Sequence, residues 1–295
     1  MGKQARRPEA ANHRQGFALT KAHGQHLLKN PLVVKTIVEK AQIKPSDVIL
    51  EIGPGTGNLT IKMLEVAKRV IACEIDPRMV TELRKRVAEQ HPHLLRKLTI
   101  VQGNFLKQEV PPFNMCISNC PYNISSAIVF RLLEIGGWRR SVLMFQKEFA
   151  QGLCAQPGDD QYSRISVNTQ MLAKTQHLLK VSRNSFRPPP KVDSSVIMLE
   201  PLPPRPNLDV NEWDSFVKTV FNRKHRTLGA IFKNKSVLAT LAELPSNAAV
   251  KDRIKEIVTQ TLEAKTITLC RSGHMKVEEL LSTMMALREA GIHFL

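Results

Sequence analysis

The segment VILEIGPGTGNLT, residues 48–60, predicts a buried strand that runs into a glycine-rich turn and then into a helix. The turn places Gly53 and Gly55 at the carboxyl end of the strand, where open α/β sheets bind their ligands. Glycine adopts positive φ without strain and lets the backbone approach a ligand closely. Glycines alone are also compatible with an ordinary turn, but their place after a buried strand favours a binding site.

Glu74 supplies the second part of this predicted site. It stands at the end of the next predicted strand, where a carboxylate can accept hydrogen bonds from both hydroxyls of a ribose. The dinucleotide pattern G-x-G-x-x-G fails because position 58 is Asn, and the phosphate-loop pattern G-x-x-x-x-G-K-S/T is absent. The turn and Glu74 therefore predict a nucleoside cofactor without a pyrophosphate, of which S-adenosyl-L-methionine is the common case.

The pattern around this segment alternates between strands and helices, as parallel α/β sheets do. Strands are predicted at residues 47–53, 69–76, 98–105, 113–119, 141–145, 177–182 and 194–201. Helices are predicted between them at residues 30–41, 58–68, 76–90, 125–136, 147–155 and 163–174. The proline cluster PLPPRPN, residues 201–207, then marks a domain boundary.

Beyond the prolines the periodicity is helical, at residues 210–235, 251–264 and 276–291. The fold class is therefore α/β, a Rossmann-like sheet followed by a small all-helical domain. We expect a basic disordered tail over residues 1–16, the sheet domain over 17–203 and the helical domain over 204–295.

The composition favours a polyanionic partner inside the cell. Lys and Arg number 43 against 26 Asp and Glu, a formal charge of +17, and such an excess suits nucleic acid or any other polyanion. The five cysteines are scattered without CxxC pairs, which predicts reduced thiols and neither a disulfide framework nor a metal site. No apolar run approaches the roughly 18 residues of a membrane span, and residues 1–16 lack the hydrophobic core of a signal peptide.

The segment SNCPYNISS, residues 118–126, follows a strand with residues that suit amine chemistry. An adenine amino group is a poor nucleophile unless two acceptors hold its protons and aim its lone pair at an electrophile. Asn119 offers a side-chain oxygen and Cys120 a main-chain oxygen, while Pro121 stiffens the turn. Tyr122 offers a face on which a base can stack. A strand-ending turn with a buried tyrosine is the alternative interpretation.

Two further segments allow two interpretations each. In NSFRPPPKVDSSV, residues 184–196, Phe186 is a second stacking surface or, as the residues alone favour, a core residue beside a rigid loop. FNRKHRTLGAIFKNK, residues 221–235, predicts a basic helix that contacts phosphates or is merely solvated. Its basic residues are Arg223, Lys224, Arg226, Lys233 and Lys235.

Several motifs in the same order resemble one family, the ribosomal RNA adenine N6,N6-dimethyltransferases, which dimethylate two adjacent adenosines near the 3′ end of small-subunit rRNA. The motifs are KAHGQHLLKNP, EIGPGTGNLT, ACEIDPR, SNCPYNISS, LMFQKEFA, FRPPPKVDSSV and AGIHFL. The resemblance runs from about residue 21 to the last residue. Three of its motifs look most like the eukaryotic branch of the family: KAHGQHLLKNP at the start, FRPPPKV, and the GIHF ending.

The resemblance implies a class I methyltransferase sheet, S-adenosyl-L-methionine as cofactor and a role for each matching residue. Cofactor contacts are implied for Gln25, His26, Leu28, Gly53, Gly55, Glu74, Asn104 and Asn119. Catalytic positions are implied for Asn119, Cys120, Pro121, Tyr122 and the second stacking aromatic, Phe186. The helical domain is implied to face rRNA. The expected partners are small-subunit rRNA and the pre-ribosomal small subunit, bound by a monomer with no membrane association.

One position departs from the family pattern. Gly103-Asn104-Phe105 stands where the family usually has Gly-Asp, whose carboxylate accepts a hydrogen bond from the cofactor's adenine amino group. Asn104 can still accept through its carbonyl oxygen, but without charge assistance. We therefore expect weakened rather than abolished cofactor binding.

The alternative function is a ribosome-assembly factor that binds immature small subunits and whose methylation is secondary or lost. The basic surface serves either function, whereas intact Glu74, Asn119 and Tyr122 favour the enzyme. We expect the protein in the nucleus and nucleolus, with the cytoplasm as the next choice. A mitochondrial relative is disfavoured because the motifs begin by residue 21, which leaves little room for a transit peptide.

Overall fold

A seven-stranded sheet forms the first part of the protein. The computed structural model describes residues 26–202 and 209–295, so the predicted tail over residues 1–16 lies outside the described residues. The strands are β2 (Val48–Ile52), β3 (Arg69–Glu74), β4 (Leu98–Gln102), β5 (Met115–Asn119), β6 (Arg140–Gln146), β7 (Ala173–Val181) and β9 (Ser194–Pro201). Their order is β4-β3-β2-β5-β6-β9-β7, with β9 antiparallel to both of its neighbours and the pairs from β4 to β6 parallel. The predicted sheet is confirmed.

The chain reverses direction across the sheet between β2 and β5. From β2 it moves outward to β3 and β4, and it then returns to the other side of β2 to form β5. Ligands of open α/β sheets bind at such a reversal, outside the carboxyl ends of the strands. The glycine turn after β2 and the SNCPY segment at the end of β5 therefore meet at one place.

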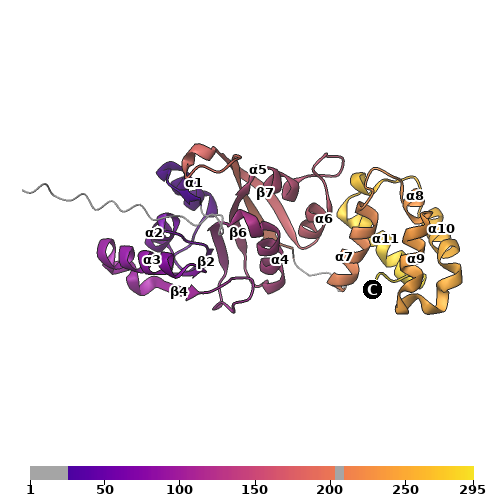
Figure 1. Cartoon of the computed structure of the whole chain (residues 1–295), viewed down its shortest axis with the longest axis horizontal. Helices are drawn as coiled ribbons and strands as arrows, with labels where there is room; N and C mark the ends of the chain where they lie inside the picture. Colours follow the sequence, from indigo (N-terminus) through magenta and orange to yellow (C-terminus); the bar gives the residue numbers. More distant parts are fainter. Residues whose placement is uncertain (1–25, 203–208) are drawn as a thin grey trace, which may run out of the picture.

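Within residues 26–202, six helices cover the two faces of the sheet (Figure 1). They are α1 (Pro31–Ala41), α2 (Asn58–Val66), α3 (Pro77–Gln90), α4 (Ser125–Ile135), α5 (Lys147–Cys154) and α6 (Arg164–Gln170). Two of them begin as the sequence predicts. Asn30 caps α1 and Asp76 caps α3 through side-chain oxygens, and a proline follows each cap.

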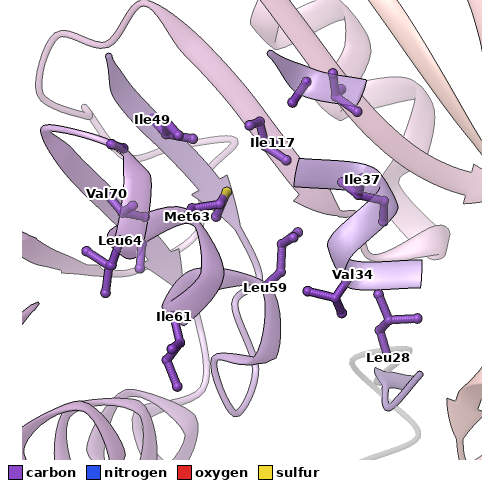
Figure 2. Packing of buried hydrophobic residues seen from close by; sticks show 14 of the residues in the cluster. Leu28, Val34, Ile37, Ile49, Leu59, Ile61, Met63, Leu64, Val70 and Ile117 are labelled. Carbon is purple, nitrogen blue, oxygen red and sulfur yellow. The ribbon is translucent and has the colours of Figure 1, made fainter. Parts of the chain in front are cut away.

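Alternate residues of β2 enter two different cores. Ile49 packs with residues of α1, α2 and α3, whereas Leu50 packs with residues of α4 and α5 on the other face. Figure 2 shows the first core, where Ile49 and Val70 of the strands lie near Met63 and Leu64 of α2. This alternation follows from the period of two in a strand, and it holds the carboxyl end of β2 rigidly between two packed layers.

Five helices form the second part over the described residues 209–295, and Figure 1 shows them gathered at one end of the molecule. They are α7 (Val210–Phe221), α8 (Leu228–Phe232), α9 (Lys235–Glu243), α10 (Ile254–Ala264) and α11 (Val277–Glu289). Shorter 3₁₀ segments are η2 (Pro92–Lys97), η3 (Tyr122–Ile124), η4 (Arg183–Ser185), η5 (Pro245–Arg253) and η6 (Ser272–His274). Within residues 209–295 the structure contains no strand, only a single bridge between Thr227 and Arg271.

Two helix ends and one small sheet differ most from the sequence prediction. The predicted helix 210–235 ends at Phe221, because a turn follows and the Thr227 side chain caps a new helix, α8. The predicted helix 163–174 ends at Gln170, because Ala173 already pairs with Pro201 of β9. A two-stranded sheet of β1 (Leu27–Leu28) and β8 (Phe186–Arg187) was not predicted, since strands of two residues leave no periodic signal.

The two parts of the chain are joined by a close interface. The Tyr162 hydroxyl, on the loop before α6, donates to Met275 O at 2.9 Å, and its ring packs in the core of the helical domain. Lys224 Nζ donates to Asp160 O and to Tyr162 O at 2.6 and 2.9 Å. Residues 203–208 lie outside the described residues, so the boundary at 203/204 stays a prediction. No helix within 26–202 and 209–295 has the length and apolarity to cross a membrane.

Candidate active site

A pocket lies at the carboxyl ends of β2, β3 and β5, where the topology predicts a ligand. It collects most of the residues that the sequence singled out for cofactor binding and catalysis. The predicted residues in its wall are His26, Leu28, Gly53, Gly55, Glu74, Asn104, Asn119, Cys120, Pro121 and Tyr122. Gln25, predicted to contact the cofactor, lies outside the described residues.

The glycine turn brings three segments into close contact. Gly53 and Gly55 have φ of 68° and 54°, the left-handed region that disfavours other residues. A Cβ on Gly55 would lie 2.8 Å from Leu27 Cδ2, and one on Gly53 would lie 3.4 Å from Pro121 Cγ. The turn therefore needs glycine both for its conformation and for the approach of the N-terminal segment and the SNCPY segment.

Glu74 presents a buried carboxylate to the pocket. One oxygen accepts from Gly55 N at 3.3 Å and the other from Asp76 N at 2.9 Å. Its side chain is only 5% exposed, and this burial raises the pKa of the carboxyl above its usual value. The two backbone donors fix the orientation of the group and leave acceptor capacity on both oxygens, as two ribose hydroxyls require.

Asn119 carries the least satisfied polar atom in the pocket. Its Nδ2 donates to His26 O at 3.0 Å, whereas its Oδ1 is buried with no hydrogen-bond partner. A buried acceptor without a donor costs about 1–3 kcal/mol, and the place of this one in the pocket fits a ligand that donates to it. The Nδ2 bond also assigns the amide orientation and turns Oδ1 away from His26.

Tyr122 follows Asn119 and is held at both ends. Its hydroxyl shares a hydrogen bond of 2.7 Å with Ser194 Oγ, and its ring stacks on the His26 ring with centroids 5.9 Å apart and planes at 25°. Burial raises the pKa of the Tyr122 phenol to about 12, so it is neutral at physiological pH. Burial also raises the pKa of the Cys120 thiol to about 12, which makes the thiol inert and leaves the main-chain carbonyl as the useful group of Cys120.

A family model described as "Ribosomal RNA adenine dimethylase" matches residues 16–266. The chain belongs to the ribosomal RNA adenine dimethylase family. The protein is thus an rRNA adenine dimethyltransferase, and its pocket at the carboxyl ends of β2, β3 and β5 is the candidate site of methyl transfer.

Named relatives agree with this assignment. A dimethyladenosine transferase of Saccharomyces cerevisiae is 47% identical over 92% of this chain and 89% of the relative. An Arabidopsis thaliana protein named as a ribosomal RNA small subunit methyltransferase is 55% identical over 78% of this chain and 65% of the relative. The crystal structure of a dimethyladenosine transferase from Plasmodium falciparum matches with a TM-score of 0.83 and 38% identity, over 92% of this chain and all of that one.

Phe186 of this dimethylase lies in the core and outside the pocket wall. It is 1% exposed, packs in the first core and does not line the pocket. Its backbone pairs with Leu28 in the β1–β8 ladder, which directs the side chain inward while Arg187 faces solvent. The structure therefore places Phe186 among the core residues, as the residues alone favoured, and the stacking role implied by the resemblance stays a prediction.

Asn104 lies in the pocket wall of the dimethylase, at the start of a turn. Its Oδ1 accepts from Leu106 N at 3.0 Å, and its main-chain oxygen accepts from Lys107 N and Gln108 N at 2.9 and 2.8 Å. An aspartate would form the same turn through one carboxylate oxygen. The substitution therefore changes the charge of the wall without requiring a change of its shape.

Three residues at or next to the dimethylase site, Glu51, Asn58 and Arg86, were not predicted to act there. Glu51, buried in the pocket wall, accepts from Thr60 Oγ1 at 2.5 Å, and burial raises the pKa of its carboxyl to about 8. Asn58 Nδ2 donates to Leu28 O at 2.7 Å, and Arg86 Nη1 donates to Asn58 Oδ1 and Thr56 O, each at 2.7 Å. An acid inside an apolar strand was a signal for Glu51, but nothing in the sequence pointed to Arg86.

The basic residues of the dimethylase do not share one helix as predicted. Arg223 and Arg226 are exposed on the turn after α7, and Lys233 and Lys235 are exposed around the start of α9. Lys224 is half-buried, and its ammonium binds two carbonyls of the sheet domain. Four of the predicted phosphate contacts are therefore on the surface, while the fifth joins the two parts of the chain.

Proposed function

We propose that this dimethylase transfers two methyl groups to N6 of each of two adjacent adenosines near the 3′ end of small-subunit rRNA, during assembly of that subunit. The buried, unpartnered Oδ1 of Asn119 carries the chemical part of this proposal. The name of the Arabidopsis relative supports the small subunit as substrate. The exposed arginines and lysines of the helical part support binding to a polyanion.

The pocket suits S-adenosyl-L-methionine. Glu74 would hold the ribose, the glycine turn would pass beneath the methionine part, and Asn104 would face the adenine amino group. A Cβ on Gly55 would lie 2.8 Å from Leu27 Cδ2, so only glycine lets Leu27 pack against this part of the pocket wall. When bound, this cofactor supplies an electrophilic methyl group on a sulfonium sulfur.

The chain's own residues activate the target amine by position. Asn119 Oδ1 accepts one N–H of the adenine amino group and Cys120 O accepts the other. The nitrogen then becomes pyramidal, and its lone pair points away from both acceptors. Tyr122 supports the base from one face. Because the Tyr122 phenol has a pKa of about 12 and the amine needs no deprotonation before it attacks, no general base is required. The proton leaves to water after transfer.

The test of the proposal uses small subunits that lack the methylation. The protein is incubated with labelled cofactor and these subunits, the rRNA is digested, and the nucleosides are separated. Dimethyladenosine is expected from the two adjacent sites, and large-subunit rRNA is the control substrate. No product with the wild-type protein would contradict the enzymatic proposal and favour the assembly factor. Product in large-subunit rRNA alone would contradict the assignment of the substrate.

We also propose that the protein acts as a monomer in the nucleolus, on the pre-ribosomal small subunit. Light scattering of the purified protein tests the first statement, and a mass near twice the monomer value would contradict it. Imaging of the tagged full chain tests the second, and exclusion from the nucleus would contradict it.

A further inference from the structure

His26 stacks on one face of Tyr122, the ring proposed to support the target base. The two rings are stacked, with centroids 5.9 Å apart and planes at 25°. A base between them would need carbon contacts of about 3.5–4.0 Å on both sides, which add to about 7 Å or more. The observed spacing is too small, so a base cannot enter this face while His26 stays in place.

Asn119 places the base and His26 in direct competition. Its Nδ2 holds the main-chain oxygen of His26 at 3.0 Å, while its Oδ1, the proposed acceptor for the target amine, belongs to the same amide. A base that meets Oδ1 with its amino group and lies on this face of Tyr122 would overlap the His26 ring. Phe186 cannot take over as a second wall, because it is buried in the core.

The His26 ring can leave without moving its backbone. The backbone is held by Asn119 and by the neighbouring ladder of Leu27 and Leu28, whereas the ring is held by Tyr122 and by one hydrogen bond, from Nδ1 to Pro188 O at 2.9 Å. His26 lines the pocket and is half-buried. Rotation about its side-chain bonds therefore frees the face of Tyr122 while the N-terminal segment stays in place.

We propose that His26 is a placeholder for the target adenine: its ring covers the stacking face of Tyr122 in the RNA-free enzyme and swings aside when the base enters. This inference rests on the proposed function, since it assumes that adenine N6 meets Asn119. His26 is then a positioning residue that acts through Tyr122. The bicyclic adenine displaces the smaller imidazole because it stacks over more area and also satisfies Asn119 Oδ1.

Steady-state kinetics with unmethylated small subunits, at saturating cofactor, provide the first test. His26→Ala removes the competitor, so the KM for the subunit should fall roughly two- to tenfold, the range given by the stacking of one aromatic pair. His26→Phe keeps a ring on Tyr122, so its KM should stay at or above the wild-type value. The KM for the cofactor is measured separately to detect loss of cofactor contacts. A raised or unchanged KM for the subunit with His26→Ala would overturn the proposal.

Nuclear magnetic resonance of histidines labelled at Cε1 gives a second test that does not depend on catalysis. Stacking on Tyr122 should shift one histidine signal upfield, and that signal should be absent in His26→Ala and move to its ordinary position in Tyr122→Leu. Addition of a synthetic RNA with two adjacent unmethylated adenosines should move it in the same way. An upfield signal that persists with RNA bound would contradict the proposal. Absence of dimethyladenosine with wild type would instead contradict the proposed function.

Discussion

Asn58 Nδ2 donates to the main-chain oxygen of Leu28 at 2.7 Å, and this bond ties the helix after the glycine turn to the N-terminal segment. Arg86 of α3 in turn holds Asn58 Oδ1 and Thr56 O, each at 2.7 Å. Asn58, the residue that breaks the dinucleotide pattern G-x-G-x-x-G, therefore links two walls of the pocket. Arg86 reaches the pocket wall through Asn58 and through Thr56 O, since Thr56 also lines the pocket.

Removing this link should weaken cofactor binding. We expect Asn58→Ala and Arg86→Ala each to raise the cofactor Kd by a few-fold to about tenfold, as loss of a hydrogen bond with a charged or buried partner does. The two effects should not add, because Arg86 acts partly through Asn58. Calorimetry on the two variants and the double variant measures the coupling. Arg84→Ala, an exposed neighbour on α3, is the control, and a fully additive cycle would contradict the linkage.

Replacement of Asn119 should affect chemistry more than cofactor binding. Asn119→Ala removes one of the two acceptors for the amine, and loss of one such preorganised group typically lowers kcat by about 10²–10³. The cofactor Kd should change much less, because Glu74 and the glycine turn stay in place. Single-turnover methylation and calorimetry measure the two quantities. Methylation by Asn119→Ala at the wild-type rate would exclude the proposed role of Oδ1.

Asn104→Asp should strengthen cofactor binding. An aspartate keeps the turn to Leu106 N and adds charge to the acceptor for the cofactor's adenine, which roughly doubles the strength of such a hydrogen bond. We expect a Kd a few-fold lower than that of wild type. Asn104→Ala is the matched variant and should bind more weakly, since it loses both the turn and the acceptor. Equal affinity of the aspartate variant and wild type in calorimetry would show that residue 104 does not contact the cofactor.

Glu51 should make stability depend on pH. The pKa of its carboxyl is about 8 in the folded protein, mainly because of burial, against about 4.3 in an unfolded chain. Between about pH 4.3 and pH 8 the Glu51 carboxyl is therefore protonated in the folded protein but ionised in the unfolded chain. The stabilisation is therefore complete below about pH 4 and is lost as the pH rises through 8.

Glu51→Gln removes this titration but retains an acceptor for Thr60. Wild type should lose stability between pH 5.5 and pH 8.5, whereas Glu51→Gln should not. The Tm of the variant minus the Tm of wild type should therefore increase by a few degrees over this pH range. Glu109→Gln, on an exposed loop, should keep the wild-type dependence. Parallel Tm curves for Glu51→Gln and wild type would show that Glu51 is not protonated at low pH.

Lys224 and Arg223 are adjacent but should act differently. Lys224→Ala removes two hydrogen bonds between the sheet and helical parts, so the free energy of unfolding should fall by about 1–3 kcal/mol. Arg223→Ala should leave Tm unchanged but weaken RNA binding and reduce the salt slope of the affinity by about 1. Thermal melts and RNA binding at several salt concentrations separate the two. An unchanged Tm for Lys224→Ala together with weaker RNA binding would contradict the assignment of Lys224 to the interface.

Much of the site was predictable because strand and turn chemistry is local. Val48 to Ile52 form a buried strand in any α/β context, and the positive φ at Gly53 and Gly55 follows from residue type and position. Glu74 and Asn119 end their strands as the apolar pattern predicts. Because carboxyl ends of parallel strands meet at one edge, their proximity in the pocket was also predictable.

Other features depend on contacts between residues far apart in the sequence. The β1–β8 ladder buries Phe186 and brings His26 to Tyr122, and two strands of two residues each carry no pattern that predicts them. Lys224 lies in a basic run, yet its ammonium is held by carbonyls of another part of the chain. The sequence by itself determined the sheet, the edge at which the pocket lies and the residues proposed to meet the amine. Only the tertiary structure decided which ring covers Tyr122 and which cations stay free, because long-range packing sets the direction of each side chain.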